Sequence, residues 1–84
     1  MVWPLLGAVR TVASVPQYRR VLGEAIRLNR KKAGFSQEKL AEKADLHPVY
    51  ISTVERGAKT ISMDALMRIA KALNVRMRDL THDL

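Results

Sequence analysis

The sequence contains no cysteine and only 5% aromatic residues, and its acidic side chains are fewer than its basic ones. The absence of cysteine excludes disulfides, thiolate zinc clusters and thiol catalysis, and it fits a reducing compartment. No apolar run approaches the roughly 20 residues that a membrane-spanning helix requires. The sequence also offers no catalytic triad, carboxylate pair, phosphate-binding loop or metal-ligating cluster. We therefore expect neither an enzyme nor a protein with a metal or other cofactor.

The charge of the chain is strongly unbalanced. Lys and Arg number 15 against 8 Asp and Glu, which gives a formal net charge of +7 on 84 residues. On so small a body this excess favours a polyanionic partner, and nucleic acid is the first candidate. Charge alone identifies no partner, because basic proteins are common. The length and the 48% hydrophobic content allow one folded domain.

Residues 1–15 form an apolar segment that we place outside the main domain of residues 16–84. The segment lacks the basic start of a secretion signal, and Arg10 interrupts its apolar core, so we expect a cytoplasmic protein without membrane association. Its apolar side chains favour an extra helix from Pro4 that packs on this chain or on a partner subunit. The alternatives are a disordered extension, or residues that precede the true start of the protein.

Helix-capping residues divide the remaining chain into five helices, and no pattern typical of strands occurs. The expected helices cover about residues 17–33, 36–44, 47–57, 62–74 and 77–80. Ser36 and Ser62 suit N-caps, Pro48 suits a first helical position, and Gly34 and Asn74 suit C-caps. Apolar side chains recur at helical spacing at Val21, Leu22, Ala25, Ile26, Leu40, Ala41, Ala44, Ile51, Val54, Leu66, Ile69, Ala70 and Leu73. We expect an all-α protein, a compact five-helix bundle.

Only three or four residues separate the second and third expected helices. So short a connection forces the two helices to cross steeply, which exposes the third helix to the major groove of double-stranded DNA. Ala41 is small where the helices come closest, and a larger side chain would push them apart. The pattern predicts a helix-turn-helix between Ser36 and Gly57.

Two segments closely resemble the Cro and lambda-repressor-type (Xre) family: Arg27-x-x-Arg30-x-x-x-Gly34-Phe35-Ser36-Gln37-x-x-Leu40-Ala41 and Tyr50-Ile51-Ser52-x-Val54-Glu55-Arg56-Gly57. The likeness covers about residues 22–80 and includes the run Ile69-Ala70-Lys71-Ala72-Leu73. Around His47 and Ser62 it resembles a subgroup of stand-alone regulators and controller proteins of restriction–modification systems. The resemblance implies a lambda-repressor-like, five-helix DNA-binding domain.

Several side chains suit contacts to the DNA backbone. These candidates are Gln37, Tyr50, Ser52, Gly57, Lys59, Thr60 and Arg30. Gln37 lies in a helical first turn, where unpaired N–H groups attract phosphate, although a capping role is the alternative. Tyr50 and Ser52 carry hydroxyls, with a partly buried ring as the alternative for Tyr50. The loop from Gly57 to Thr60 resembles a backbone clamp, although Lys59 is equally compatible with a solvated lysine.

The resemblance also implies an ion pair between Arg30 and Glu55 that joins the first helix to the third, with Arg30 also able to touch phosphate. Asn29 departs from the family pattern, in which an apolar side chain is usual. Partial exposure, or a hydrogen bond to a neighbouring backbone group, would accommodate it.

The residues expected to contact bases are His47, Pro48, Val49 and Thr53. The commoner family pattern has Arg or Gln at one of these positions, whereas Pro48 and Val49 have no side-chain donor. Val49 suits a thymine methyl, and Thr53 suits a methyl or a base edge, so DNA shape is expected to contribute to specificity. His47 is either a base contact or an N-cap. Distant His82 is the only other histidine, which excludes a metal role.

One such module contacts only half an operator, so we expect a homodimer whose modules lie about 34 Å apart. Candidates for the dimer interface are Val75, Met77, Leu80 and Leu84, with Leu80 equally suited to the core. The expected function is a transcriptional regulator of a near-palindromic operator, autoregulatory or a restriction–modification controller, with RNA polymerase as a further candidate partner. The alternative is an antitoxin-type protein that binds a toxin as well as DNA.

Overall fold

The computed structural model describes residues 15–84, with side chains from residue 17 onward, and the regular secondary structure of this part of the chain is entirely helical. Its helices are α2 (Val15–Lys32), α3 (Gln37–Ala44), α4 (Pro48–Glu55), α5 (Met63–Leu73) and α6 (Met77–Thr81). The expected all-α, five-helix bundle is confirmed. The alternatives for the N-terminal segment concern residues outside the described range. None of the described helices is long and apolar enough to cross a membrane.

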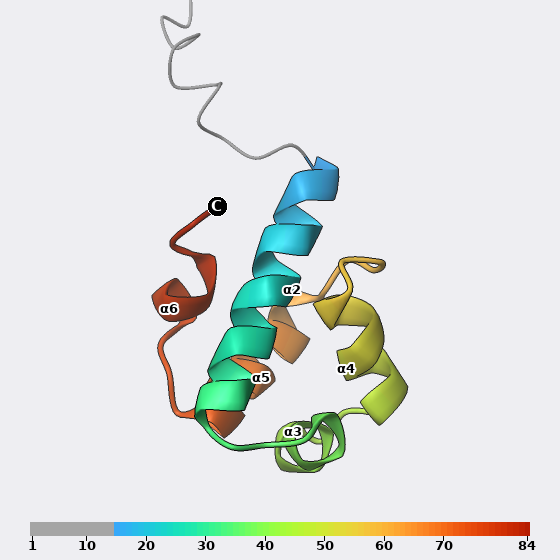
Figure 1. Cartoon of the computed structure of the whole chain (residues 1–84), viewed down its shortest axis with the longest axis vertical. Coiled ribbons are helices and arrows are strands. Elements are labelled where there is room, and N and C mark those ends of the chain that lie inside the picture. Colours follow the sequence, from blue (N-terminus) through green and yellow to red (C-terminus); the bar gives the residue numbers. More distant parts are fainter. Residues whose placement is uncertain (1–14) are drawn as a thin grey trace, which may run out of the picture.

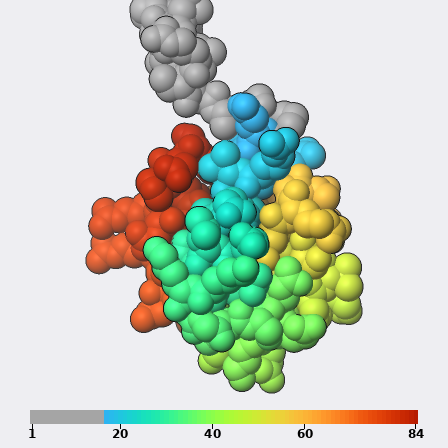
Figure 2. Space-filling view, in the orientation of Figure 1, coloured from blue at the N-terminus to red at the C-terminus, as the bar shows by residue number. Residues whose placement is uncertain are grey.

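α2 is the longest helix and runs through the middle of the bundle (Figure 1). It packs against α4 on one side and α6 on the other, while α3 packs against both α4 and α5. In the space-filling view, α2 fills the centre of the face between the C-terminal segment and α4 with its following loop (Figure 2). The two helices of the expected helix-turn-helix therefore lie at one edge of the molecule.

The helix ends are set by local hydrogen bonds. The hydroxyl of Ser36 accepts from the Lys39 N–H at 2.9 Å, and that of Ser62 accepts from the Ala65 N–H at 3.1 Å. Gly34 and Asn74 adopt positive φ angles of 77° and 58°, as expected for C-caps. Asp45 also has a positive φ, 58°. It ends α3 within the tight turn expected at Asp45 and Leu46. The left-handed conformation of this turn, which aspartate tolerates better than most residues, was not predicted.

The core receives one fully buried large side chain from every described helix: Ile26, Leu40, Ile51, Ile69 and Leu80. Burial of each such side chain contributes about 1.5–3 kcal/mol. Most of the expected apolar positions are buried. Val21 and Ala25 are exceptions, because their part of α2 borders an open groove and leaves them only half-buried.

Gly23 sets the distance between α2 and α4. A Cβ atom at this position would lie 2.4 Å from the carbonyl oxygen of Val54 and 2.7 Å from that of Glu55. Contacts this short involve backbone atoms, so no side-chain rotation can relieve them. The missing side chain lets α2 approach the C-terminal end of α4. Sequence reasoning missed this residue, although a glycine inside a helix is costly and therefore informative.

Candidate nucleic-acid interface

The corner between α3 and α4 consists of residues 45–47. The Leu46 N–H donates to the Ala41 carbonyl at 2.9 Å, which closes the turn. Ala41 is only 1% exposed, in accordance with its expected place at the crossing of the two helices. α4 therefore lies on the outside of the corner, and Val49, near its N-terminal end, is exposed.

A buried ion pair fixes α4 to α2. Arg30 donates from Nε to Oε2 of Glu55 at 2.7 Å and from Nη2 to Oε1 at 3.0 Å. Its Nη1 donates to the Phe35 carbonyl at 2.8 Å. The hydrogen bonds and the negative charge of Glu55 raise the pKa of Arg30 above its ordinary value, against the opposing effect of burial. The side chains are 10% and 3% exposed, so Arg30 belongs to the interior and offers little surface to a phosphate.

Gln37 is tied to the same carboxylate. Its Nε2 donates to Oε1 of Glu55 at 3.0 Å, which connects the first turn of α3 to the end of α4. One N–H of the amide is used in this way, and the amide has a second N–H and an oxygen for another partner. The backbone N–H groups in the first turn of α3 also point out of the helix.

Tyr50 and Lys59 bring α4 together with the loop that follows it. The Tyr50 hydroxyl accepts from the Ser62 N–H at 3.4 Å, and the Lys59 ammonium lies 5.5 Å from the centre of the ring. The ring is half-buried against the core, but the proton of its hydroxyl is not used in this bond. Gly57 reverses the chain with a φ of 74°. Lys59 and Thr60 are exposed.

Arg56 was not predicted from the sequence as a contact residue. It is exposed, and its Nη1 donates to the Ser52 hydroxyl at 2.8 Å. This bond leaves the Ser52 hydroxyl proton available and places a cation beside it. The signal that could have found Arg56 is its spacing of four residues from Ser52, which puts both on one face of a helix.

We call His47, Pro48, Val49 and Thr53 the reading face. His47 caps α4, because its Nδ1 accepts from the Val49 N–H at 3.0 Å. Val49 is 64% exposed, and Pro48 and Thr53 are half-buried. The Thr53 hydroxyl donates to the Val49 carbonyl at 2.8 Å. Thus one of the two roles expected for His47, the N-cap, is present in the fold.

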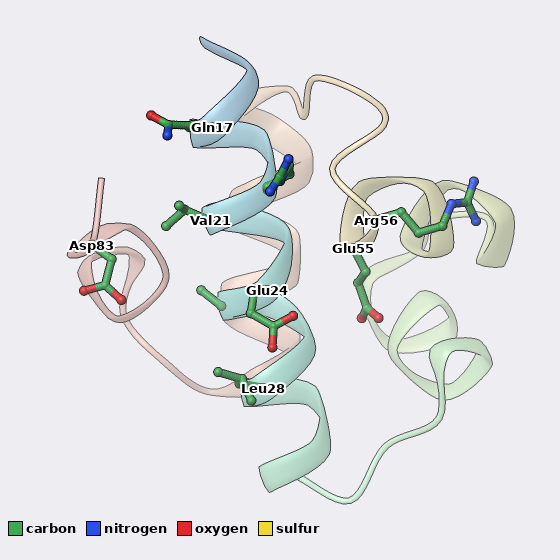
Figure 3. Close-up of a pocket in the computed structure, with 9 residues that line it drawn as sticks. Gln17, Val21, Glu24, Leu28, Glu55, Arg56 and Asp83 are labelled. Atoms are coloured by element: carbon green, nitrogen blue, oxygen red, sulfur yellow. The ribbon is translucent and has the colours of Figure 1, made fainter. Parts of the chain in front are cut away.

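A shallow groove runs along α2, between the C-terminal end of the chain and the end of α4 (Figure 3). Gln17, Val21, Glu24 and Leu28 line it from α2, opposite Asp83, with Glu55 and Arg56 at the end of α4. It holds charges of both signs and contains none of the reading face. The groove therefore lies apart from the reading face, although Arg56 borders both the groove and the surface around the Ser52 hydroxyl.

The four residues expected at a dimer interface differ in exposure. Leu80 is 1% exposed and belongs to the core, so it has almost no surface to offer a partner. Val75 and Met77 are half-buried against the core, and Leu84 is exposed. Two further exposed apolar side chains on α5, Met63 and Met67, were not singled out from the sequence.

Asn29 is accommodated by one of the two arrangements expected for it. Its side-chain amide donates to the Ala25 carbonyl at 2.8 Å, one turn earlier in α2. An amide can therefore replace the usual apolar residue here without an unpaired donor.

Comparisons with known proteins agree with this geometry. The helix-turn-helix family matches residues 26–80. Control protein C.BamHI of Bacillus amyloliquefaciens is 46% identical over 63 residues, which are 74% of this chain and 78% of that protein. Control protein C.SmaI of Serratia marcescens is 41% identical over 56 residues, 67% of each chain.

Solved structures show the same similarity. The restriction-modification controller protein C.AhdI from Aeromonas hydrophila superposes with a TM-score of 0.73 and 34% identity, over 74% of this chain and 94% of that one. The clp gene regulator ClgR from Corynebacterium glutamicum superposes with a TM-score of 0.78 and 33% identity, over 83% and 74%. With the steep α3–α4 corner and the family match over most of its length, the chain belongs to the helix-turn-helix family and is a DNA-binding transcriptional regulator, not an enzyme.

Proposed function

We propose that the chain controls a restriction–modification system, as a homodimer that binds a near-palindromic operator close to its own promoter. The observation that carries this proposal is the 46% identity to a control protein over 74% of the chain. The second control protein and the controller-protein structure support it. A regulator of this kind acts where the DNA is, in the cytoplasm, and residues 16–84 form its DNA-binding domain.

The proposed contacts to the DNA backbone come from two places, the start of α3 and the end of α4 with the loop that follows it. Gln37 presents its second amide N–H beside the first-turn N–H groups of α3, where a phosphate is favoured. Tyr50, Ser52, Gly57, Lys59 and Thr60 surround the end of α4 and its loop. Arg56 joins this set, whereas Arg30 leaves it because its nitrogens are used inside the fold.

Base recognition is assigned to the reading face. Val49 is 64% exposed, and its apolar side chain suits a thymine methyl. The Thr53 hydroxyl is held by the backbone of α4, which turns its methyl group into the part free for contact. With few donors on this face, part of the specificity comes from the shape and deformability of the operator.

Dimerisation supplies the second DNA-binding module, which binds the second half-site of the operator. The interface is proposed at Val75, Met77 and Leu84, which have apolar surface outside the core. A stable dimer places two copies of α4 about 34 Å apart, one turn of DNA, so that both reach the major groove on the same face. Contact with RNA polymerase bound next to the operator then determines activation or repression.

The test is binding to the DNA upstream of the gene across a salt series. We expect a steep fall of affinity with salt, and a retained preference over random DNA. Lys59→Gln should lower the log–log salt slope by about one. Lys71→Gln, which removes an exposed lysine from α5, is the matched control and should leave the slope unchanged.

Two results would contradict the proposal. Equal competition by random DNA at every salt concentration would exclude operator binding. Co-purification of a stoichiometric second protein that displaces the DNA would favour the antitoxin-type alternative.

A further inference from the structure

The cap of α4 determines which nitrogen of His47 carries the proton. The Val49 N–H can only donate, so the Nδ1 atom 3.0 Å away must accept with its lone pair. A neutral imidazole that accepts at Nδ1 carries its proton on Nε2. The capping bond therefore leaves an N–H donor at Nε2, on a side chain that is exposed.

Other donors at this end of α4 are already used. Pro48 has no N–H, and the N–H groups of Tyr50 and Ile51 donate to the His47 carbonyl at 3.0 Å and 3.3 Å. The Thr53 hydroxyl proton goes to the Val49 carbonyl. Within the described part of the chain, no partner is found for Nε2 of His47. It is thus the single side-chain donor left on the reading face.

We propose that His47 acts as cap and reader at once, with its Nε2–H directed to the major-groove edge of a guanine in each half-site. This inference rests on the proposed function, because it requires that α4 enters the major groove. Guanine is favoured because its edge presents two acceptors, N7 and O6, and no donor. Adenine places a donor beside its N7, cytosine presents a donor, and thymine places a methyl beside its single acceptor.

The residue type fits both tasks. A serine or aspartate at this position would cap the helix but has no N–H for a base, and aspartate would also be repelled by DNA. Arginine would reach a guanine but cannot accept a hydrogen bond from the Val49 N–H. Histidine, like asparagine, can accept the capping bond with one atom and donate to a base with another. His47 is therefore the residue that determines specificity at this position of the operator.

The experiment uses the full chain and a duplex selected by it from a randomised pool. Each guanine of the selected site is replaced in turn by 7-deazaguanine, which has a C–H in place of the N7 acceptor. For the natural protein, one symmetric pair of guanines should show a loss of about 2- to 10-fold per half-site, as for a single hydrogen bond. With His47→Ser, which keeps the cap, the same replacement should cause no further loss.

Thr53→Val is the matched control on the reading face, because the Thr53 hydroxyl is used within α4. It should retain the full 7-deazaguanine penalty. The tautomer is checked independently in the protein without DNA, by the two-bond proton–nitrogen NMR correlations of the ring. A major Nδ1–H tautomer would overturn the inference.

The remaining outcomes separate this inference from the proposed function. If the selected duplex is bound specifically but no guanine shows a penalty that depends on residue 47, His47 is a cap alone and the inference fails while the function stands. If selection enriches no sequence at all, operator binding itself fails, and the inference fails with it.

Discussion

Glu55 connects three structural elements through one carboxylate. It accepts two hydrogen bonds from Arg30 on α2 and one from Gln37 on α3, and its side chain is 3% exposed. Because the pair is buried and both oxygens are used, the carboxylate fixes where α4 lies relative to the rest of the fold. Interior residues thus determine the position and orientation of the residues proposed to face the DNA.

We predict that Glu55→Ala lowers the free energy of unfolding by about 3–5 kcal/mol, because it leaves the Arg30 guanidinium buried without its partner. Urea denaturation followed by circular dichroism measures this change. Glu24→Ala is the control: Glu24 pairs with Arg27 at 3.3 Å, but the side chains are 54% and 42% exposed, so the loss should stay below about 1 kcal/mol. Equal losses for the two variants would contradict the structural role of Glu55.

The same pair predicts a simple dependence on pH. The pKa of Arg30 is raised, chiefly by its hydrogen bond to Glu55. A raised pKa in the folded state means that the contribution of the Arg30 charge to the free energy of unfolding is complete below the ordinary arginine pKa. It is lost only as pH rises through the pKa that Arg30 has in the folded protein. The arginine therefore contributes no change of stability across the neutral range. The difference in the free energy of unfolding between the natural protein and Glu55→Ala can be measured from mildly acidic to mildly basic pH. It should show no step from Arg30.

Individual residues differ in how far the sequence predicts them. The Arg30–Glu55 pair was predicted, because the resemblance to the family implied it. The bond from Gln37 to Glu55 was not, because it joins side chains 18 positions apart and depends on how α3 crosses α4. His47 illustrates the opposite case. Its cap depends on a neighbour two residues away, so local sequence was enough to suggest it.

The helices themselves were predicted to within about two residues, because their ends depend on short-range capping. Ser36, Ser62 and Asn74 each act within three or four residues of their position in the chain. A tight turn at Asp45 was expected, but its left-handed conformation was not, since most non-glycine residues avoid positive φ. Gly23 was also missed, because its importance comes from the approach of another helix.

We predict that Gly23→Ala destabilises the protein by about 1–3 kcal/mol, as expected for overpacking against backbone atoms. The sign makes the test sharp. Helix propensity alone would make alanine more favourable than glycine by about 1 kcal/mol. Urea denaturation distinguishes the two, with Lys31→Ala, an exposed change in the same helix, expected within about 0.5 kcal/mol of the natural protein. Stabilisation by Gly23→Ala would show that α2 and α4 are not in close contact.

Across the whole molecule, apolar residues predict which positions are buried. They do not predict whether the core or a second subunit buries them. Leu80 illustrates this limit: its helical position suited both the core and a second subunit, and only the packing of α6 on α2 and α5 places it inside. Met67 shows the converse, an apolar residue on a regular helix that is 57% exposed. The sequence could therefore indicate a dimer but could not assign its surface.

The proposed dimer surface makes a prediction for the intact protein. Leu84→Lys should raise the dimer dissociation constant at least about tenfold, because by two-fold symmetry one substitution places two charges in the same interface. Leu84 is 38% exposed in the single chain, so the change should leave the fold intact. Sedimentation equilibrium measures the constant, and affinity for a complete operator should fall with it while affinity for a half-site stays the same.

Met67→Lys is the matched control for this experiment, since it introduces the same charge at an exposed apolar position of α5. It should leave the dimer intact if the interface lies at Val75, Met77 and Leu84. The reverse result, dissociation by Met67→Lys alone, would move the interface to the outer face of α5. The two copies of α4 would then be set apart by a different pair of surfaces, and the half-site spacing of about 34 Å would have to be derived from that face.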